Sequence, residues 1–95
     1  MTQNWTSWEQ KVLDTFVRDG RILRLPAKMK KRKVVLRWVT GKIPANVRIP
    51  HAEFNARIQR HFADSATIRR EMFEFGYVHR DRDFYWRDQA SEKES

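Results

Sequence analysis

Apolar residues near the start of the chain recur at the spacing of one face of a helix. The residues on that face are Trp8, Val12, Leu13 and Phe16. Just before them, Thr6 and Glu9 have the Ser/Thr-x-x-Glu spacing of a capping box, which satisfies free backbone N–H groups at the beginning of a helix. We therefore predict a helix that begins after Thr6 and buries this face.

A turn, an extended segment and a second helix are predicted next. Asp19-Gly20 is a turn signal, and the mostly apolar run 21–25 predicts an edge strand or extended segment. The second helix is expected from about Pro26 or Ala27 to Thr40, with the proline tolerated in its first turn and Gly41 ending it. Its pattern separates apolar residues from cations. The apolar side holds Met29, Val35, Leu36 and Val39, and the opposite stripe holds Lys30, Lys33 and Arg37.

The middle of the chain predicts a short strand and two helices joined by a tight turn. Residues 47–49 favour a strand, and Pro50 opens the next element. A third helix is expected at about 51–62, and Asp64 is a good N-cap for a fourth at about 65–75. Such a short connection is typical of a helix-turn-helix. The faces expected to be buried are Phe54, Ile58 and Phe62 in the third helix and Ile68, Met72 and Phe75 in the fourth.

The end of the chain predicts a β-hairpin. Runs 77–80 and 84–87 are β-prone, and Asp81-Arg82-Asp83 joins them without the glycine of a strong turn signal. Gly76 is the expected cap of the preceding helix. The order helix, short strand, helix, tight turn, helix, hairpin is that of a winged helix. We therefore predict an α+β winged helix-turn-helix with an extra N-terminal helix and short strand, as one domain over 6–87 with flexible tails at 1–5 and 88–95.

Length and composition narrow the class of protein. The 95 residues are too few for a Rossmann domain, a hydrolase sheet or a β/α barrel. No apolar run approaches the ~20 residues of a membrane span, and the first six residues lack a signal-peptide pattern. We expect a cytoplasmic protein without a membrane partner. The absence of cysteine agrees with this and excludes zinc fingers, iron–sulfur clusters and thiol nucleophiles.

The excess positive charge is concentrated in twenty residues. The chain has 20 Lys and Arg against 12 Asp and Glu, a net charge of +8. Between Arg18 and Arg37 nine basic residues accompany a single acid, Asp19, and the rest of the chain is balanced. Positive charge concentrated in so short a segment indicates a polyanionic binding partner, most often nucleic acid. The simpler alternative is a solubilising face or a flexible basic arm.

Three groups of residues are candidates for nucleic-acid contact. The cluster at the start of the second helix would hold phosphates, because the N–H groups and dipole of a helix start also favour anions. The fourth helix would enter the major groove of DNA, although two glutamates make it neutral overall. The hairpin would touch phosphates. The candidates are Lys28, Lys30, Lys31, Arg32, Lys33 and Arg37, then Thr67, Arg69 and Arg70, and last Arg80 and Arg82.

Each group also has a structural interpretation. Lys28 and Arg32 lie toward the apolar side of their helix, where at least one could extend along the core. Arg70 and Glu74 have the spacing of an i,i+4 ion pair. The two adjacent arginines of the fourth helix could instead stabilise the fold by pairing with an acid such as Asp64.

The aromatic residues leave a further alternative open. They could stack on single-stranded bases, but such residues are more often core or dimer surface. Trp5 precedes the first cap, so it either packs back or meets a partner, and Phe73 lies off the buried stripe and is expected to be exposed. The residues concerned are Trp5, Trp38, Phe73, Tyr77, Phe84 and Trp86.

No pattern of catalytic or metal-binding residues stands out. His51, His61 and His79 share no helical face and lack ligand spacing. There is no Ser/His/Asp order, glycine-rich phosphate loop or paired-carboxylate pattern. We therefore expect no enzymatic activity, metal or cofactor.

Several stretches together resemble a known family. They are Pro26-Ala27-Lys28-x-Lys30-Lys31-Arg32, Val35-Leu36-Arg37-Trp38, Glu53 with Asn55, Asp64-x-Ala66-Thr67-x-Arg69-Arg70-Glu71, Gly76 and Tyr85-Trp86. Over about residues 16–87 the chain resembles the family catalogued as domain of unknown function 2087. The resemblance implies a bacterial transcription regulator, alone or behind a helix-turn-helix repressor domain, with no enzymatic activity. The chain departs from the family pattern at Pro50, where a polar cap is usual, and at Asp81-Arg82-Asp83, where glycine is usual.

We therefore expect a DNA-binding protein of bacterial transcription regulation. In this hypothesis the basic helix contacts phosphates and the fourth helix lies in the major groove. Two alternatives remain: an adaptor that docks on an acidic protein partner, and an RNA-binding domain. A homodimer is plausible because one such domain covers few base pairs.

Overall fold

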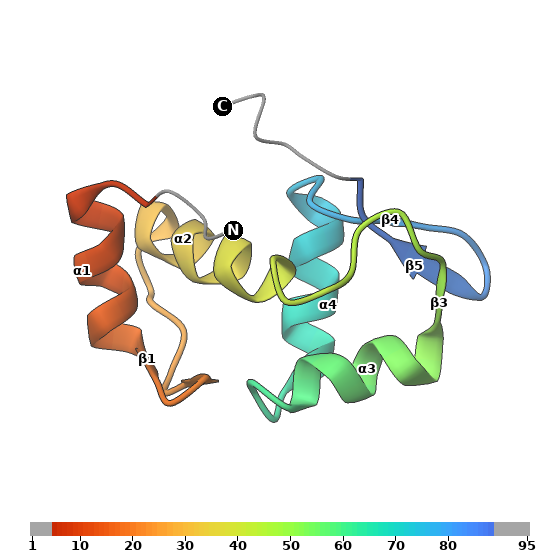
Figure 1. Ribbon diagram of the computed structural model, residues 1–95, viewed down its shortest axis with the longest axis horizontal. Helices are drawn as coiled ribbons and strands as arrows, with labels where there is room; N and C mark the ends of the chain where they lie inside the picture. The colour runs from red at the N-terminus through yellow and green to blue at the C-terminus, as the bar shows by residue number, and fades with distance from the viewer. Residues whose placement is uncertain (1–4, 89–95) are drawn as a thin grey trace.

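The computed structural model describes residues 5–88 (Figure 1). Its helices are α1 (Ser7–Phe16), α2 (Met29–Thr40), α3 (His51–Gln59) and α4 (Ser65–Glu74). Its strands are β1 (Val17–Arg18), β2 (Arg21–Ile22), β3 (Ile49–Pro50), β4 (His79–Arg80) and β5 (Phe84–Trp86). β1 pairs with β2, and the other three strands form an antiparallel sheet in the order β3-β5-β4.

The fold is α+β, as the sequence predicts. The order α2-β3-α3-α4-β4-β5 agrees with a winged-helix-like domain, preceded here by α1 and a β1–β2 pair. Figure 1 shows α1 and β1 at one end of the molecule, the three-stranded sheet at the other, and α2 and α4 between them. None of the helices in the described part of the chain is long and apolar enough to cross a membrane.

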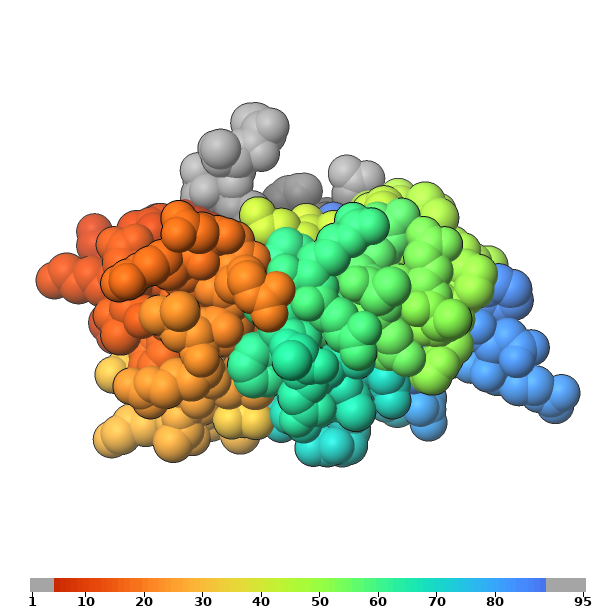
Figure 2. Space-filling view, turned by 90° about the horizontal axis from the view of Figure 1, so that it is seen from below, coloured from red at the N-terminus to blue at the C-terminus, as the bar shows by residue number. Residues whose placement is uncertain are grey.

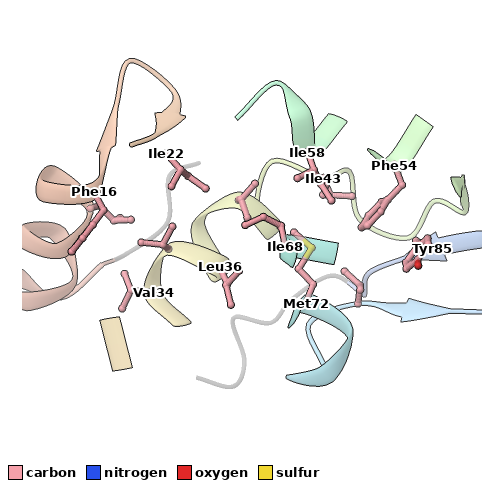
Figure 3. Packing of buried hydrophobic residues seen from close by; sticks show 14 of the residues in the cluster. Phe16, Ile22, Val34, Leu36, Ile43, Phe54, Ile58, Ile68, Met72 and Tyr85 are labelled. Carbon is pink, nitrogen blue, oxygen red and sulfur yellow. The ribbon is translucent and has the colours of Figure 1, made fainter. Parts of the chain in front are cut away.

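One apolar core connects the two ends of the molecule. Figure 3 shows it extending from Phe16 of α1, through Leu36 and Met72, to Phe54 and Tyr85. The rings of Phe54 and Tyr85 are stacked with centroids 4.5 Å apart, which joins α3 to the central strand of the sheet. The core therefore holds the N-terminal elements and the winged-helix-like part together.

The start of α1 follows the prediction, but its first apolar residue does not. The Thr6 hydroxyl accepts from the Glu9 N–H at 3.1 Å, and the Glu9 carboxylate accepts from the Thr6 N–H at 2.9 Å, which completes the capping box. Val12, Leu13 and Phe16 are buried, whereas Trp8 is 46% exposed. The prediction that Trp8 is buried is wrong because its side chain lines an open hollow of the surface instead of packing in the core.

The turn after α1 is a hairpin, which the sequence prediction missed. Asp19 and Gly20 have φ values of +54° and +77°, and Val17 pairs with Ile22 and Arg18 with Arg21. Two left-handed residues between paired strands form the two-residue turn that an Asp-Gly dipeptide favours. Helix α1 ends at Phe16, before the strand that leads into this turn, so the Asp19-Gly20 signal marks a strand pair and not the end of the helix.

Helix α2 begins later than predicted. Lys28 is its N-cap, and Pro26 lies two residues before this cap, outside the helix. The Pro26 carbonyl accepts from Arg32 Nη1 at 3.1 Å, a contact that fixes this residue outside the helix. The end at Thr40 before Gly41 is confirmed. The buried residues of α2 are Val34, Val35, Leu36 and Val39, while Met29 is 50% exposed.

The predicted set of buried residues in α2 differs from the observed set for one reason. Amphipathic spacing assumes one buried face, but α2 packs against both α1 and α4. Val34 is buried as a result, although a single-face pattern does not predict it. Met29 is exposed because it stands at the first helical position, at the open end of this packing.

The boundaries around α3 shift by two or three residues. The strand comprises Ile49 and Pro50, which pair with Tyr85 and Phe84, whereas Val47 is exposed. Helix α3 ends at Gln59, three residues before the predicted end, because its last turn tightens: the His61 N–H donates to the Ile58 carbonyl. Phe54 and Ile58 are buried, and Phe62, which lies outside the helix, is only half-buried.

Both ends of α4 have clear local causes. Asp64 is the N-cap and accepts from the Thr67 N–H, as predicted. At the other end, Gly76 has φ +80°, and the N–H groups of Gly76 and Tyr77 donate to the carbonyls of Phe73 and Met72. This is a Schellman motif, with glycine in the left-handed position. The helix therefore ends at Glu74, one residue early, and leaves Phe75 half-buried at the C-cap.

Candidate nucleic-acid interface

Arg32 joins α2 to α4. Its Nε and Nη2 donate to the two carboxylate oxygens of Glu71 at 2.6 and 2.8 Å, and its Nη1 donates to Pro26. Both side chains of the pair are largely buried, and Glu71 raises the pKa of Arg32. This fork-to-fork geometry engages both oxygens of the Glu71 carboxylate. Arg32, a candidate for phosphate contact, is therefore placed where it stabilises the fold.

Arg37 joins α2 to α1. Its Nη2 lies 2.5 Å from Glu9 Oε2, and its guanidinium lies 5.2 Å from the centroid of the Trp5 ring. Trp5 packs back on the core rather than standing free. The pKa of Glu9 is lowered by the Thr6 N–H and by Arg37, against the opposing effect of burial. Arg37 thus has a carboxylate partner, although 42% of its side chain stays exposed.

Two of the three candidates in α4 are engaged within the domain. The Thr67 hydroxyl donates to Asp64 Oδ2 at 2.7 Å, so it belongs to the cap and lowers the pKa of Asp64. Arg69 Nη1 donates to Asn55 Oδ1 and is half-buried, which joins α4 to α3. Arg69 therefore finds an amide on α3 rather than the Asp64 carboxylate.

The exposed side of α4 holds the third candidate. Ala66, Arg70, Phe73 and Glu74 are exposed there, and no ion pair among residues 5–88 includes Arg70 or Glu74. The Arg80 guanidinium lies 4.6 Å from the centroid of the Phe73 ring. Phe73 is exposed as predicted, and this contact brings a cation of the hairpin to the surface of α4.

The hairpin turn is built by a carboxylate in place of glycine. Asp81 Oδ1 accepts from the N–H groups of Asp83 and Phe84, both at 3.1 Å, and Oδ2 pairs with Arg48. Burial raises the pKa of Asp81, but these hydrogen bonds outweigh it and the pKa is lowered. The strands are shorter than predicted, at His79–Arg80 and Phe84–Trp86, because the Gly76 turn occupies the beginning of the first run.

Arg48 is a residue that the sequence prediction missed. Its guanidinium lies 4.5 Å from the Trp86 ring centroid and 5.2 Å from that of Phe84, besides its pairing with Asp81. It therefore holds the turn against the strand that carries both aromatic rings. No local pattern could identify this role, since 33 residues separate Arg48 from Asp81.

Three of the four lysines at the beginning of α2 are exposed to solvent. Lys28, Lys30 and Lys33 are exposed, and the Lys33 ammonium lies 4.9 Å from the centroid of the Phe75 ring at the end of α4. Lys31 is half-buried and faces α1. Lys33 of α2 and Arg80 of the hairpin thus both reach the end of α4. The candidate residues of α2, α4 and the hairpin therefore lie next to each other.

We call the outward cations of these three groups the basic face. None of its members has a carboxylate within 4.0 Å in the described part of the chain. In Figure 2 the gold start of α2, the teal start of α4 and the blue β4–β5 turn follow one edge of the molecule. The basic face consists of Lys28, Lys30, Lys33, Arg70, Arg80 and Arg82, all of them exposed.

The chain belongs to the family described as "Uncharacterized protein conserved in bacteria" (DUF2087), whose model matches residues 21–87. The matched region includes β2 and the whole winged-helix-like part, whereas α1 and β1 precede it. No curated protein and no solved structure matches the chain.

Proposed function

We propose that this member of the DUF2087 family binds duplex DNA through the basic face and acts in bacterial transcription regulation. The observation that supports this most is how the cations are distributed. Arg32, Arg37 and Arg69 have partners inside the domain, while no ion pair within 4.0 Å includes a cation of the basic face in the described residues; Arg70 attracts Asp64 only from farther away. These cations gather on three adjacent elements. Unpaired cations on one surface favour a polyanion.

The proposal gives each element its own role. Lys30 and Lys33 contact phosphates, because a compact ammonium on a flexible stem tolerates many backbone geometries. Arg70 reaches base edges from α4, where an exposed guanidinium suits guanine. Arg82 and Arg80 contact phosphates beside the helix. Arg69 and Thr67 stabilise α4 through contacts inside the domain. In this proposal Arg70 therefore determines the sequence preference.

The proposal can be tested by titrating the protein into a fluorescent random duplex of ~30 base pairs and measuring anisotropy at ~0.1 M and ~0.3 M salt. We expect binding at the lower salt and a steep loss at the higher salt. An excess of structured RNA as competitor separates duplex DNA from RNA as the preferred polymer. Folded protein that leaves the anisotropy unchanged at ~0.1 M salt would contradict the proposal.

A further inference from the structure

A hollow on the α1 side of α2 has a different character from the basic face. It opens between α1 and the segment that leads into α2, and Trp8, Val12 and Phe16 of α1 provide its apolar surface. Val12 and Phe16 are almost completely buried beneath it, whereas Trp8 is 46% exposed. The hollow thus has an apolar floor beside a large indole that is about half exposed among the described residues.

Further apolar side chains are exposed close by along the chain. Leu23 is 53% exposed and Met29 is 50% exposed, and both belong to the segment or helix start that borders the hollow. Together with Trp8 they are three of the five large apolar side chains exposed in the described residues. Of the three, only Trp8 lines the hollow, and its exposed indole is the apolar side chain that a partner would contact there.

The rim of the hollow is positively charged. The lining includes Lys11 of α1, Arg24 of the segment before α2 and Lys31 of α2, and it includes no carboxylate. The Arg24 guanidinium lies 4.9 Å from the centroid of the Phe16 ring, which holds it at the edge of the floor. The α1 acids lie elsewhere: Glu9 pairs with Arg37, and Asp14 accepts from Gln10 at 2.9 Å.

We propose that this hollow docks an acidic, amphipathic peptide segment of a partner protein. A bulky apolar side chain of the peptide would contact Trp8 and Val12, and flanking carboxylates would pair with Lys11 and Arg24. Exposed tryptophan is a frequent centre of binding energy, and charges at a rim select and orient a partner. A nucleic-acid backbone would satisfy the cations but would leave the apolar floor uncovered.

This site goes beyond DNA binding. It faces α1, and only Lys31 among the residues proposed from the sequence for nucleic acid lines it. Its partner could therefore bind while the outward stripe of α2 and the exposed side of α4 stay free. Such an arrangement fits a regulator that is held by, or recruits, a second protein.

The test uses the full chain and a fluorescein-labelled peptide of about 12 residues in which Phe and Leu stand four positions apart among Asp and Glu. A matched peptide carries Ser in place of Phe and Leu. We expect the first peptide to bind and the second to bind at least about tenfold more weakly. Equal binding of both peptides, or no binding of the first, would overturn the proposal.

Two pairs of variants locate the site. Trp8→Ser should weaken the binding of the first peptide about tenfold or more, whereas Phe73→Ser, which removes an exposed aromatic ring elsewhere, should leave it unchanged. Lys11→Glu should weaken it more than Lys42→Glu, which makes the same charge change at an exposed lysine outside the hollow. Equal effects within both pairs, in variants with unchanged circular dichroism, would show that the hollow is not the binding site.

Discussion

Helix α2 carries different cations on the sides that face other helices and on the side that faces solvent. Arg32 and Arg37 reach Glu71 of α4 and Glu9 of α1, while Lys30 and Lys33 have no carboxylate partner among the described residues. The planar guanidinium matches a carboxylate in two-pronged geometry, whereas the strongly hydrated ammonium is better suited to water or a mobile phosphate. The positive charge of α2 therefore divides into a part that assembles the domain and a part that is free to bind.

Removing Arg32 should have the largest effect on the stability of the domain. Arg32→Ala leaves the Glu71 carboxylate largely buried without its partner, so the free energy of unfolding should fall by about 2–3 kcal/mol. Lys30→Ala plus Lys33→Ala should change it by less than about 0.5 kcal/mol. Urea unfolding followed by circular dichroism measures both values. Similar losses in the two variants would mean that the arginine and the lysines have the same role.

The same division continues in α4, where Arg69 is engaged and Arg70 is not. After a preferred duplex has been selected from a random pool, Arg70→Ala should reduce the preference for it over random DNA by about 1–2 kcal/mol, because a base contact is lost. Arg69→Ala should act mainly on stability, through the lost contact with Asn55. If Arg70→Ala weakens selected and random duplexes equally, α4 does not determine sequence preference.

Replacing the exposed lysines should affect all DNA sequences alike. Lys30→Ala plus Lys33→Ala should lower the slope of log affinity against log salt by about 2, since each phosphate contact contributes about 0.9. Anisotropy titrations over a range of salt concentrations give this slope. Lys11→Ala plus Lys42→Ala removes the same charge from other surfaces and serves as the control. An unchanged slope in the first variant would place the phosphate contacts elsewhere.

The smallest effect is expected from the ion pair between α1 and α2, whose arginine side chain is 42% exposed. The pKa of Glu9 is lowered from its ordinary value of 4.5, so its pairing stabilises the fold above that pH and is lost as the pH falls through the lowered pKa. Glu9→Gln should reduce stability near neutral pH by less than about 1 kcal/mol and should converge with the wild type in acid. Thermal unfolding at several pH values tests this. A difference that grows below pH 4 would contradict the assignment.

The two hairpins show which features local sequence can predict. Asp19-Gly20 sits between paired strands in left-handed backbone that this dipeptide favours, although His61 also contacts the turn: its Nδ1 lies 2.6 Å from the Gly20 carbonyl oxygen, and its own carbonyl accepts from the Ile22 N–H. The β4–β5 turn lacks glycine and depends on Asp81 and on Arg48, a residue from before β3. The β4–β5 hairpin was nevertheless predicted, because its two strands are β-prone runs. The contacts of Asp81 and Arg48 that stabilise its turn were not predicted.

The sequence by itself determined the four helices, the strand before α3, the C-terminal hairpin, their order and the location of the charge, but not the β1–β2 pair. Thr6, Asp64 and Gly76 act on backbone groups within a few residues, so the ends that they cap could be predicted from local pattern. The family and the α+β class follow from the same local information, repeated along the chain.

Only the tertiary structure decided which cations are free. Arg32 and Glu71 are 39 residues apart, and Arg37 and Glu9 are 28 apart, so no local pattern distinguishes these arginines from the neighbouring lysines. Packing of α2 between α1 and α4 brings the carboxylates within reach of the arginines, buries Val34 and leaves Trp8 uncovered. The binding surfaces of this protein are what remains after these long-range pairings, because charge and apolar area are free to bind only where the fold itself has not used them.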